Sequence, residues 1–138
     1  MKDYLTKSQK IKVTCIVRHG NKILLLRSTQ VTDSEHQSRG GYFDIPSFTV
    51  SFGEDPKKTL ESTLEEYLGS PVDEISMLDM RQYLVHDETT QIFDLLFTAK
   101  TISEIEVHER FGKLMFVEQS ELDAYMFPQE RMYLKRYL

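Results

Sequence analysis

Residues 41–69 read GYFDIPSFTVSFGEDPKKTLESTLEEYLG, and this stretch decides the fold. The apolar segment Tyr42 to Ile45 predicts a short β-strand, which a loop follows. The acidic pair Glu54 and Asp55 and the following Pro56 then suit the start of a helix, because acidic side chains stabilise a helix N-terminus and proline fits the first turn. Gly69 supplies a stop for that helix. The stretch therefore predicts a strand, a loop and one helix.

Apolar side chains recur along the expected helix at the spacing of a single helical face, at Leu60, Leu64 and Leu68. Tyr67 lies in the same sector, so its ring extends this apolar surface. Thr63 lies beside the stripe. We therefore expect Thr63 and Tyr67 to join or border the core and not to form an open metal site.

This stretch resembles the signature of the Nudix hydrolases, G-x5-E-x7-R-E-U-x-E-E-x-G-U, where U is a bulky aliphatic residue. The signature is usually preceded by an aromatic residue, a Leu or Ile, and Pro-Gly, and Tyr42, Ile45 and Pro46 match this preface. Within the signature the sequence has the family's Gly-Glu, its small-apolar pair and three later positions: Gly53, Glu54, Thr59, Leu60, Leu64, Glu66 and Gly69. The resemblance extends over about residues 11–125. It implies an α/β fold, a Nudix-type α/β/α sandwich in which a curled mixed β-sheet lies between the box helix and a C-terminal helical segment.

The match is to a degenerate Nudix box. Ser47 and Phe48 stand where the family has two glycines, and Ser62 replaces its arginine. Thr63 and Tyr67 replace two glutamates. Ser70 replaces the final aliphatic residue.

The replaced glutamates matter because carboxylates at positions i, i+3 and i+4 share one helical face, where the family holds divalent cations against a diphosphate. Here Glu66 is the one carboxylate left on that face. In a slipped register Glu65 and Glu66 would form the acidic pair. That slip puts Thr63 on the core side in place of Leu64, and it leaves a serine at the first carboxylate position.

The resemblance implies roles for particular residues. Glu54 and Glu66 would be catalytic, Glu66 and Glu109 would bind metal, and the cofactor of an active protein would be Mg²⁺ or Mn²⁺. Glu106 lies in the same polar loop as Glu109 and is an alternative donor; the simpler interpretation of both is a charged loop.

A long polar loop, residues 29–41, corresponds to a loop beside the substrate in the resembled family. Arg27, His36 and Arg39 are candidate donors to phosphate or ribose, or else solvated loop residues. The implied partner is a small molecule of the nucleoside-diphosphate type. A net charge of -5 argues against an extended nucleic-acid surface.

The length of 138 residues fits a single Nudix-like domain, 1–138, with a polar leader at 1–9 and a C-terminal helical segment at 118–138. The lone cysteine, Cys15, lies in a strand-like run and is expected to be a buried thiol. No secretion signal or membrane-length apolar run is present, so the expected location is the cytoplasm.

Further strands are expected at residues 11–17, 22–27, 75–85, 91–100 and 114–117. Asp94 interrupts an apolar run, so it is either paired in the core or turned toward solvent.

Three functions remain open. The chain is a metal-dependent hydrolase of nucleoside-diphosphate-linked substrates with weak or lost activity, a non-catalytic nucleotide-binding or regulatory domain, or a structural interaction module. In the last case its C-terminal segment, rich in tyrosine and leucine, contacts a partner and a homodimer is possible.

Overall fold

The computed structural model describes residues 7–27, 43–86, 88–101, 113–126 and 128–138. Its strands are β1 (Ser8–His19), β2 (Lys22–Arg27), β3 (Ser47–Val50), β4 (Asp73–Val85), β5 (Thr90–Lys100) and β6 (Lys113–Glu118). Its helices are α2 (Pro56–Leu68), the 3-10 turn η3 (Gln119–Glu121), α3 (Leu122–Tyr125) and α4 (Pro128–Lys135). None of the helices in these ranges is long and apolar enough to cross a membrane.

The strands form one six-stranded mixed sheet in the order β4-β5-β1-β2-β6, with β3 also paired to β1. The central pair, β1 and β5, is parallel, and the other pairs are antiparallel. β4 and β6 end the path, so among the described residues β4 has a neighbouring strand on one side only. The predicted mixed sheet is confirmed.

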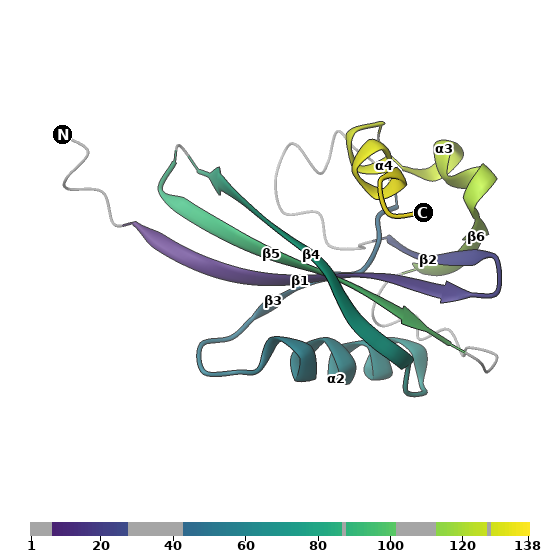
Figure 1. Ribbon diagram of the computed structural model, residues 1–138, viewed down its shortest axis with the longest axis horizontal. Helices are drawn as coiled ribbons and strands as arrows, with labels where there is room; N and C mark the ends of the chain where they lie inside the picture. Colours follow the sequence, from purple (N-terminus) through teal and green to yellow (C-terminus); the bar gives the residue numbers. More distant parts are fainter. Residues whose placement is uncertain (1–6, 28–42, 87, 102–112, 127) are drawn as a thin grey trace.

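Helices cover both faces of this sheet (Figure 1). Strand residues alternate between the faces, so Val13, Cys15 and Val17 pack beneath α2 while Ile16 packs beneath α3 and α4. The first core cluster includes Leu60, Leu64 and Leu68 of α2, and the second includes Leu122 of α3 and Leu134 of α4. The predicted α/β/α sandwich is confirmed.

The ends of α2 follow from local chemistry, as predicted. The Asp55 side chain accepts a 3.0 Å hydrogen bond from the backbone N–H of Lys58, and Pro56 opens the first turn. Gly69 ends the helix at φ 75°, a left-handed conformation in which a side chain would be strained. The helix length and its buried face are thus set within its own segment.

The strand predicted at Tyr42–Ile45 is wrong. Of the described residues in that segment, only Asp44 makes a β-bridge, to Leu26, while Phe43 and Ile45 are buried in the core below α3 and α4. The strand lies further along the chain, at Ser47–Val50. Its position is determined by pairing with β1 and not by local hydrophobicity.

The boundary of the polar leader at residue 9 is also wrong. Ser8 and Gln9 already pair with Thr90 and Gln91 of β5 and belong to β1. Polar residues fit there because this end of β1 is exposed.

Cys15 provides a test of the core beneath α2. Its side chain is fully buried, and burial raises the pKa of the thiol to about 12. Because the thiolate is the reactive form, Cys15 in the folded protein should not react with Ellman's reagent at pH 8. The same protein in guanidinium chloride should release one equivalent of chromophore. Rapid labelling of the folded protein would contradict the packing.

Candidate functional site

The structure places two of the predicted acidic site residues on the surface. Glu54 lies in the turn before α2, and Glu66 lies on the helix; both side chains are exposed. Among the residues that the structure describes, no three His, Cys, Asp or Glu side chains come close enough to hold a metal ion. The donors in these ranges therefore do not fit a multi-ion cage.

The remaining predicted site residues cannot be placed. The backbone of Arg27 ends β2 opposite Lys113, but its side chain lies outside the described part of the structure. His36, Arg39 and Glu109 also lie outside the described residues.

Two aromatic side chains of the stretch 41–69 contact each other. The rings of Phe48 and Tyr67 lie 5.4 Å apart between centroids, tilted by 34°, and both pack against the core beneath α2. Burial, and secondarily the charge of Glu66, raises the pKa of the Tyr67 phenol above its ordinary value. Thr63 is half-buried. The prediction that Tyr67 borders the core is confirmed, whereas for Thr63 half-burial alone is observed.

Ser47 and Phe48 are neighbours in β3, so their side chains lie on opposite faces of the sheet. Phe48 points toward α2, whereas its neighbour Ser47 lines a cavity on the opposite face of the sheet. This cavity has a volume of about 210 Å³. Its lining residues come from β1, β3, β4, β5, α4 and the segment before β3: Lys12, Thr14, Asp44, Ile45, Ser47, Arg81, Asp94, Glu130 and Tyr133.

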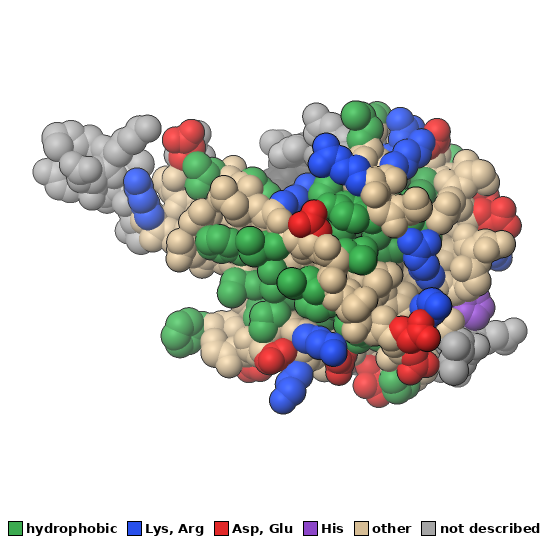
Figure 2. All heavy atoms as spheres, viewed as in Figure 1, with side chains coloured by type: hydrophobic (Ala, Val, Ile, Leu, Met, Phe, Trp, Pro, Cys, Tyr) green, Lys and Arg blue, Asp and Glu red, His purple; other side chains and the backbone are tan. Residues whose placement is uncertain are grey.

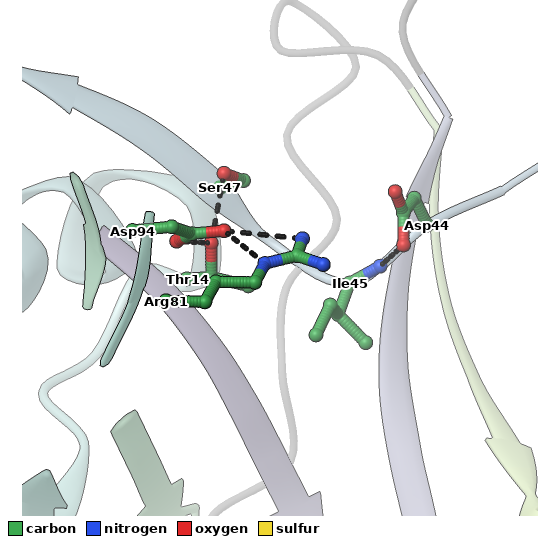
Figure 3. A network of polar contacts seen from close by, with 6 residues as sticks. All are labelled: Thr14, Asp44, Ile45, Ser47, Arg81 and Asp94. Atoms are coloured by element: carbon green, nitrogen blue, oxygen red, sulfur yellow. Dashed lines mark hydrogen bonds and ion pairs between the residues drawn. The ribbon is translucent and has the colours of Figure 1, made fainter. Parts of the chain in front are cut away.

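The buried carboxylate of Asp94 organises the cavity (Figure 3). Its Oδ1 accepts a 2.6 Å hydrogen bond from the Thr14 hydroxyl. Thr14 Oγ1 also lies 3.0 Å from Ser47 Oγ, and since Thr14 donates its proton to Asp94, Ser47 is the donor in that second bond. Asp94 thereby links β5 to β1 and, through Thr14, to β3.

Arg81 supplies the counter-charge from β4. Its Nε and Nη2 atoms each lie 3.2 Å from Asp94 Oδ2, so the guanidinium binds this oxygen in two contacts (Figure 3). The guanidinium carbon also lies 3.8 Å from the ring centroid of Tyr133 in α4. Burial raises the pKa of Tyr133 to about 12, so its ring remains a neutral surface for the cation.

The sequence marks only part of this cavity. Asp94 was singled out because it interrupts an apolar strand, and the structure selects the core-paired alternative. Thr14, Arg81 and Tyr133 carried no local signal, since a threonine or an arginine in a strand and a tyrosine in a helix are all ordinary surface residues.

No protein-family model and no curated protein matches the sequence. Solved structures do match. A MutT protein from Bacillus halodurans has a TM-score of 0.71 at 20% identity, over 91% of this chain and 80% of the other. A MutT Nudix hydrolase from Burkholderia pseudomallei has a TM-score of 0.72 at 15% identity, over 94% and 98%. A MutT protein from Methanosarcina mazei has a TM-score of 0.68 at 18% identity, over 96% of this chain and 94% of the other. The chain therefore has the Nudix fold, as the sequence resemblance predicted.

The contact between Phe48 and Tyr67 should appear as an energetic coupling. In a double-mutant cycle of Phe48→Ala and Tyr67→Ala, we expect the two losses of unfolding free energy to differ from additivity by about 0.5–1.5 kcal/mol, the usual range for an aromatic pair. Urea unfolding of the four proteins measures it. In a matched control cycle of Phe48→Ala with Tyr83→Ala, on another strand, the two losses of unfolding free energy should be additive. Coupling of equal size in both cycles would contradict a specific contact between Phe48 and Tyr67.

Removal of the Asp94 carboxylate should destabilise the protein. Asp94→Ala leaves Arg81 and Thr14 without their buried acceptor, and we expect a loss of about 2–4 kcal/mol in unfolding free energy. Asp123→Ala is the control, because Asp123 also pairs with arginine, Arg131 at 3.2 Å, but its side chain is 59% exposed. That loss should be below about 1 kcal/mol. Equal losses in urea unfolding would refute a structural role specific to Asp94.

Proposed function

We propose that this Nudix-fold protein binds a small ligand of the nucleoside-diphosphate type and hydrolyses it far more slowly than an intact Nudix hydrolase, or not at all. The single observation that carries the proposal is the ring contact between Phe48 and Tyr67. It joins two positions at which the box departs from the resembled signature.

The chemical argument concerns charge. A diphosphate needs cations that neutralise it and stabilise the leaving group, and those cations need several oxygen ligands. Tyr67 offers a neutral phenol packed on Phe48, and Thr63 offers a half-buried hydroxyl. Glu66 and Glu54 retain carboxylates, but no third donor joins either of them among the described residues. If Mg²⁺ or Mn²⁺ binds, Glu66 and Glu109 are its proposed ligands and Glu54 and Glu66 the proposed catalytic residues.

The expected effect on rate is large. Loss of metal stabilisation of several kcal/mol corresponds to roughly three or more powers of ten in turnover. The proposal therefore places turnover well below about 1 per second, the lower end of typical enzymes.

Support for ligand binding comes from the cavity on the other face. Two hydroxyls (Thr14 and Ser47), two cationic groups (Lys12 and Arg81) and three carboxyl groups (Asp44, Asp94 and Glu130) line it together. Its volume of about 210 Å³ is below the roughly 300–1,000 Å³ of most small-molecule sites, so it suits one ring system of a larger ligand. Arg27, His36 and Arg39 remain the proposed donors to the phosphate or ribose part.

The decisive experiment restores the box. Wild-type protein and the variant Ser47→Gly, Phe48→Gly, Thr63→Glu, Tyr67→Glu are assayed for hydrolysis of ADP-ribose and nucleoside triphosphates with Mg²⁺ and with Mn²⁺. We expect little turnover by the wild type and at least a tenfold gain in the variant, since Thr63→Glu and Tyr67→Glu return two carboxylates to α2. Thermal unfolding checks that the variant is folded.

Glu66→Gln in both backgrounds is the matched control. It should abolish the gain in the restored variant and change little in the wild type. Wild-type turnover of an ordinary enzyme, about 1–10³ per second, would refute the loss of activity. Calorimetric titration with ADP-ribose and nucleoside diphosphates tests binding, and absence of heat across the panel would refute the ligand-binding part.

A further inference from the structure

The edge strand β4 has an exposed apolar surface. Four of the eight exposed large hydrophobic side chains in the described part of the chain lie on this one strand: Met77 at 58%, Leu78 at 43%, Met80 at 51% and Leu84 at 52%. In Figure 1, β4 crosses in front of the sheet between α2 below and α4 above, and Figure 2 shows hydrophobic side chains gathered in this region. A long apolar edge strand is a site at which another strand can add.

The backbone of β4 leaves hydrogen-bonding groups at this edge. The N–H of Met80 donates to the side chain of its neighbour Asp79 at 2.8 Å, so it points away from β5. Alternate residues of an antiparallel strand direct their backbone groups to the same side. Gln82 and Leu84 therefore also direct their N–H and C=O groups away from β5.

A row of glutamine amides crosses the sheet and ends at the same place. Gln9 Nε2 of β1 donates to Gln91 Oε1 of β5 at 2.8 Å, and Gln91 Nε2 donates to Gln82 Oε1 of β4 at 2.8 Å. The row therefore ends with the Gln82 amide at the open edge, where its Nε2 donates to none of the described residues. Such amide rows extend when a further strand brings another glutamine into line.

We propose that a second copy of this chain pairs with β4 in an antiparallel manner, about a two-fold axis that passes through Gln82, and so joins the two sheets. In this register Gln82 faces Gln82 of the other copy, and the two amide rows become continuous. Met80 faces Leu84 of the other copy, which covers these two of the four exposed apolar side chains. Arg81 faces Tyr83, a ring that already lies 5.2 Å from the guanidinium carbon within one chain.

Self-complementarity favours a second copy over a different partner. The segment 80–84 is complementary to itself about Gln82. The two-fold axis pairs an apolar residue with an apolar residue, an arginine with a tyrosine ring and an amide with an amide. Each apolar and cation–ring pair occurs twice, once on either side of the axis. The Asp79–Met80 hydrogen bond can also persist. The N–H of Gln82 then binds the C=O of Gln82, and the N–H of Leu84 binds the C=O of Met80, each twice by symmetry. The dimer depends on neither the ligand nor the activity proposed above.

Sedimentation equilibrium of the full chain, over about 1–200 µM, tests the proposal. The wild type should approach twice the monomer mass of 16.2 kDa as concentration rises. Gln82→Lys places two like charges directly opposite each other and should be monomeric over this range. Gln82→Glu should also be monomeric. A 1:1 mixture of the two should dimerise, because lysine then faces glutamate across the axis.

Met132→Lys is the matched control, since Met132 is an exposed methionine, at 66%, on α4. It should dimerise like the wild type. Circular dichroism and thermal unfolding check that every variant is folded, and all three substitutions lie at exposed positions. A wild type that stays monomeric, a dimeric Gln82→Lys, or a mixture that stays monomeric would each overturn the proposal.

Discussion

The buried carboxylate of Asp94 is the constraint on which the cavity and the placement of α4 depend. An ionised carboxylate removed from water costs several kcal/mol unless hydrogen bonds and an opposite charge offset that cost. Its partners must therefore be supplied from nearby elements: Thr14 of β1 and Arg81 of β4. Arg81 in turn lies on the ring of Tyr133, so the same carboxylate fixes where α4 packs against the sheet. The cavity is the space that these polar contacts leave open.

The face of the sheet that α2 covers is held by apolar packing. Beneath α2 the core is apolar, and Phe48 and Tyr67 extend it. The resembled signature would place carboxylates at positions 63 and 67, beside the apolar face of the helix. In this chain Tyr67 adds to hydrophobic burial, which stabilises the helix on the sheet but supplies no anionic ligand. Under the function proposed above, the Tyr67 side chain adds to packing at a position where a carboxylate could bind metal.

The sequence predicts features whose causes are local. Asp55, Pro56 and Gly69 fix the ends of α2 through contacts within a few residues, and the period of its leucines fixes its buried face. The segment before β3 was assigned wrongly because Phe43 and Ile45 have the hydrophobicity of strand residues, yet their burial comes from α3 and α4.

The candidate site is less predictable because its contacts join residues that are far apart in the sequence. The bond between Thr14 and Asp94 joins residues 80 positions apart, and that between Arg81 and Asp94 joins residues on two neighbouring strands. No spacing along the chain marks them as a unit. The roles expected of His36, Arg39 and Glu109 lie outside the described residues and stay predictions.

The edge strand β4 carries apolar side chains whose exposure its contacts within the chain do not explain. On the α4 side the strand is held at alternate residues, Arg81 by Asp94 and Asp79 by the hydroxyl of Tyr137. The Tyr137 hydrogen bond, followed by that from the Met80 N–H, lowers the pKa of Asp79, so this contact is present above the ordinary pKa of an aspartate and is lost as pH falls through the lowered value. These polar contacts position the strand without Met80 and Leu84, whose side chains are about half exposed. Intramolecular packing therefore does not account for the apolar character of these two residues, whereas pairing between two copies of β4 does.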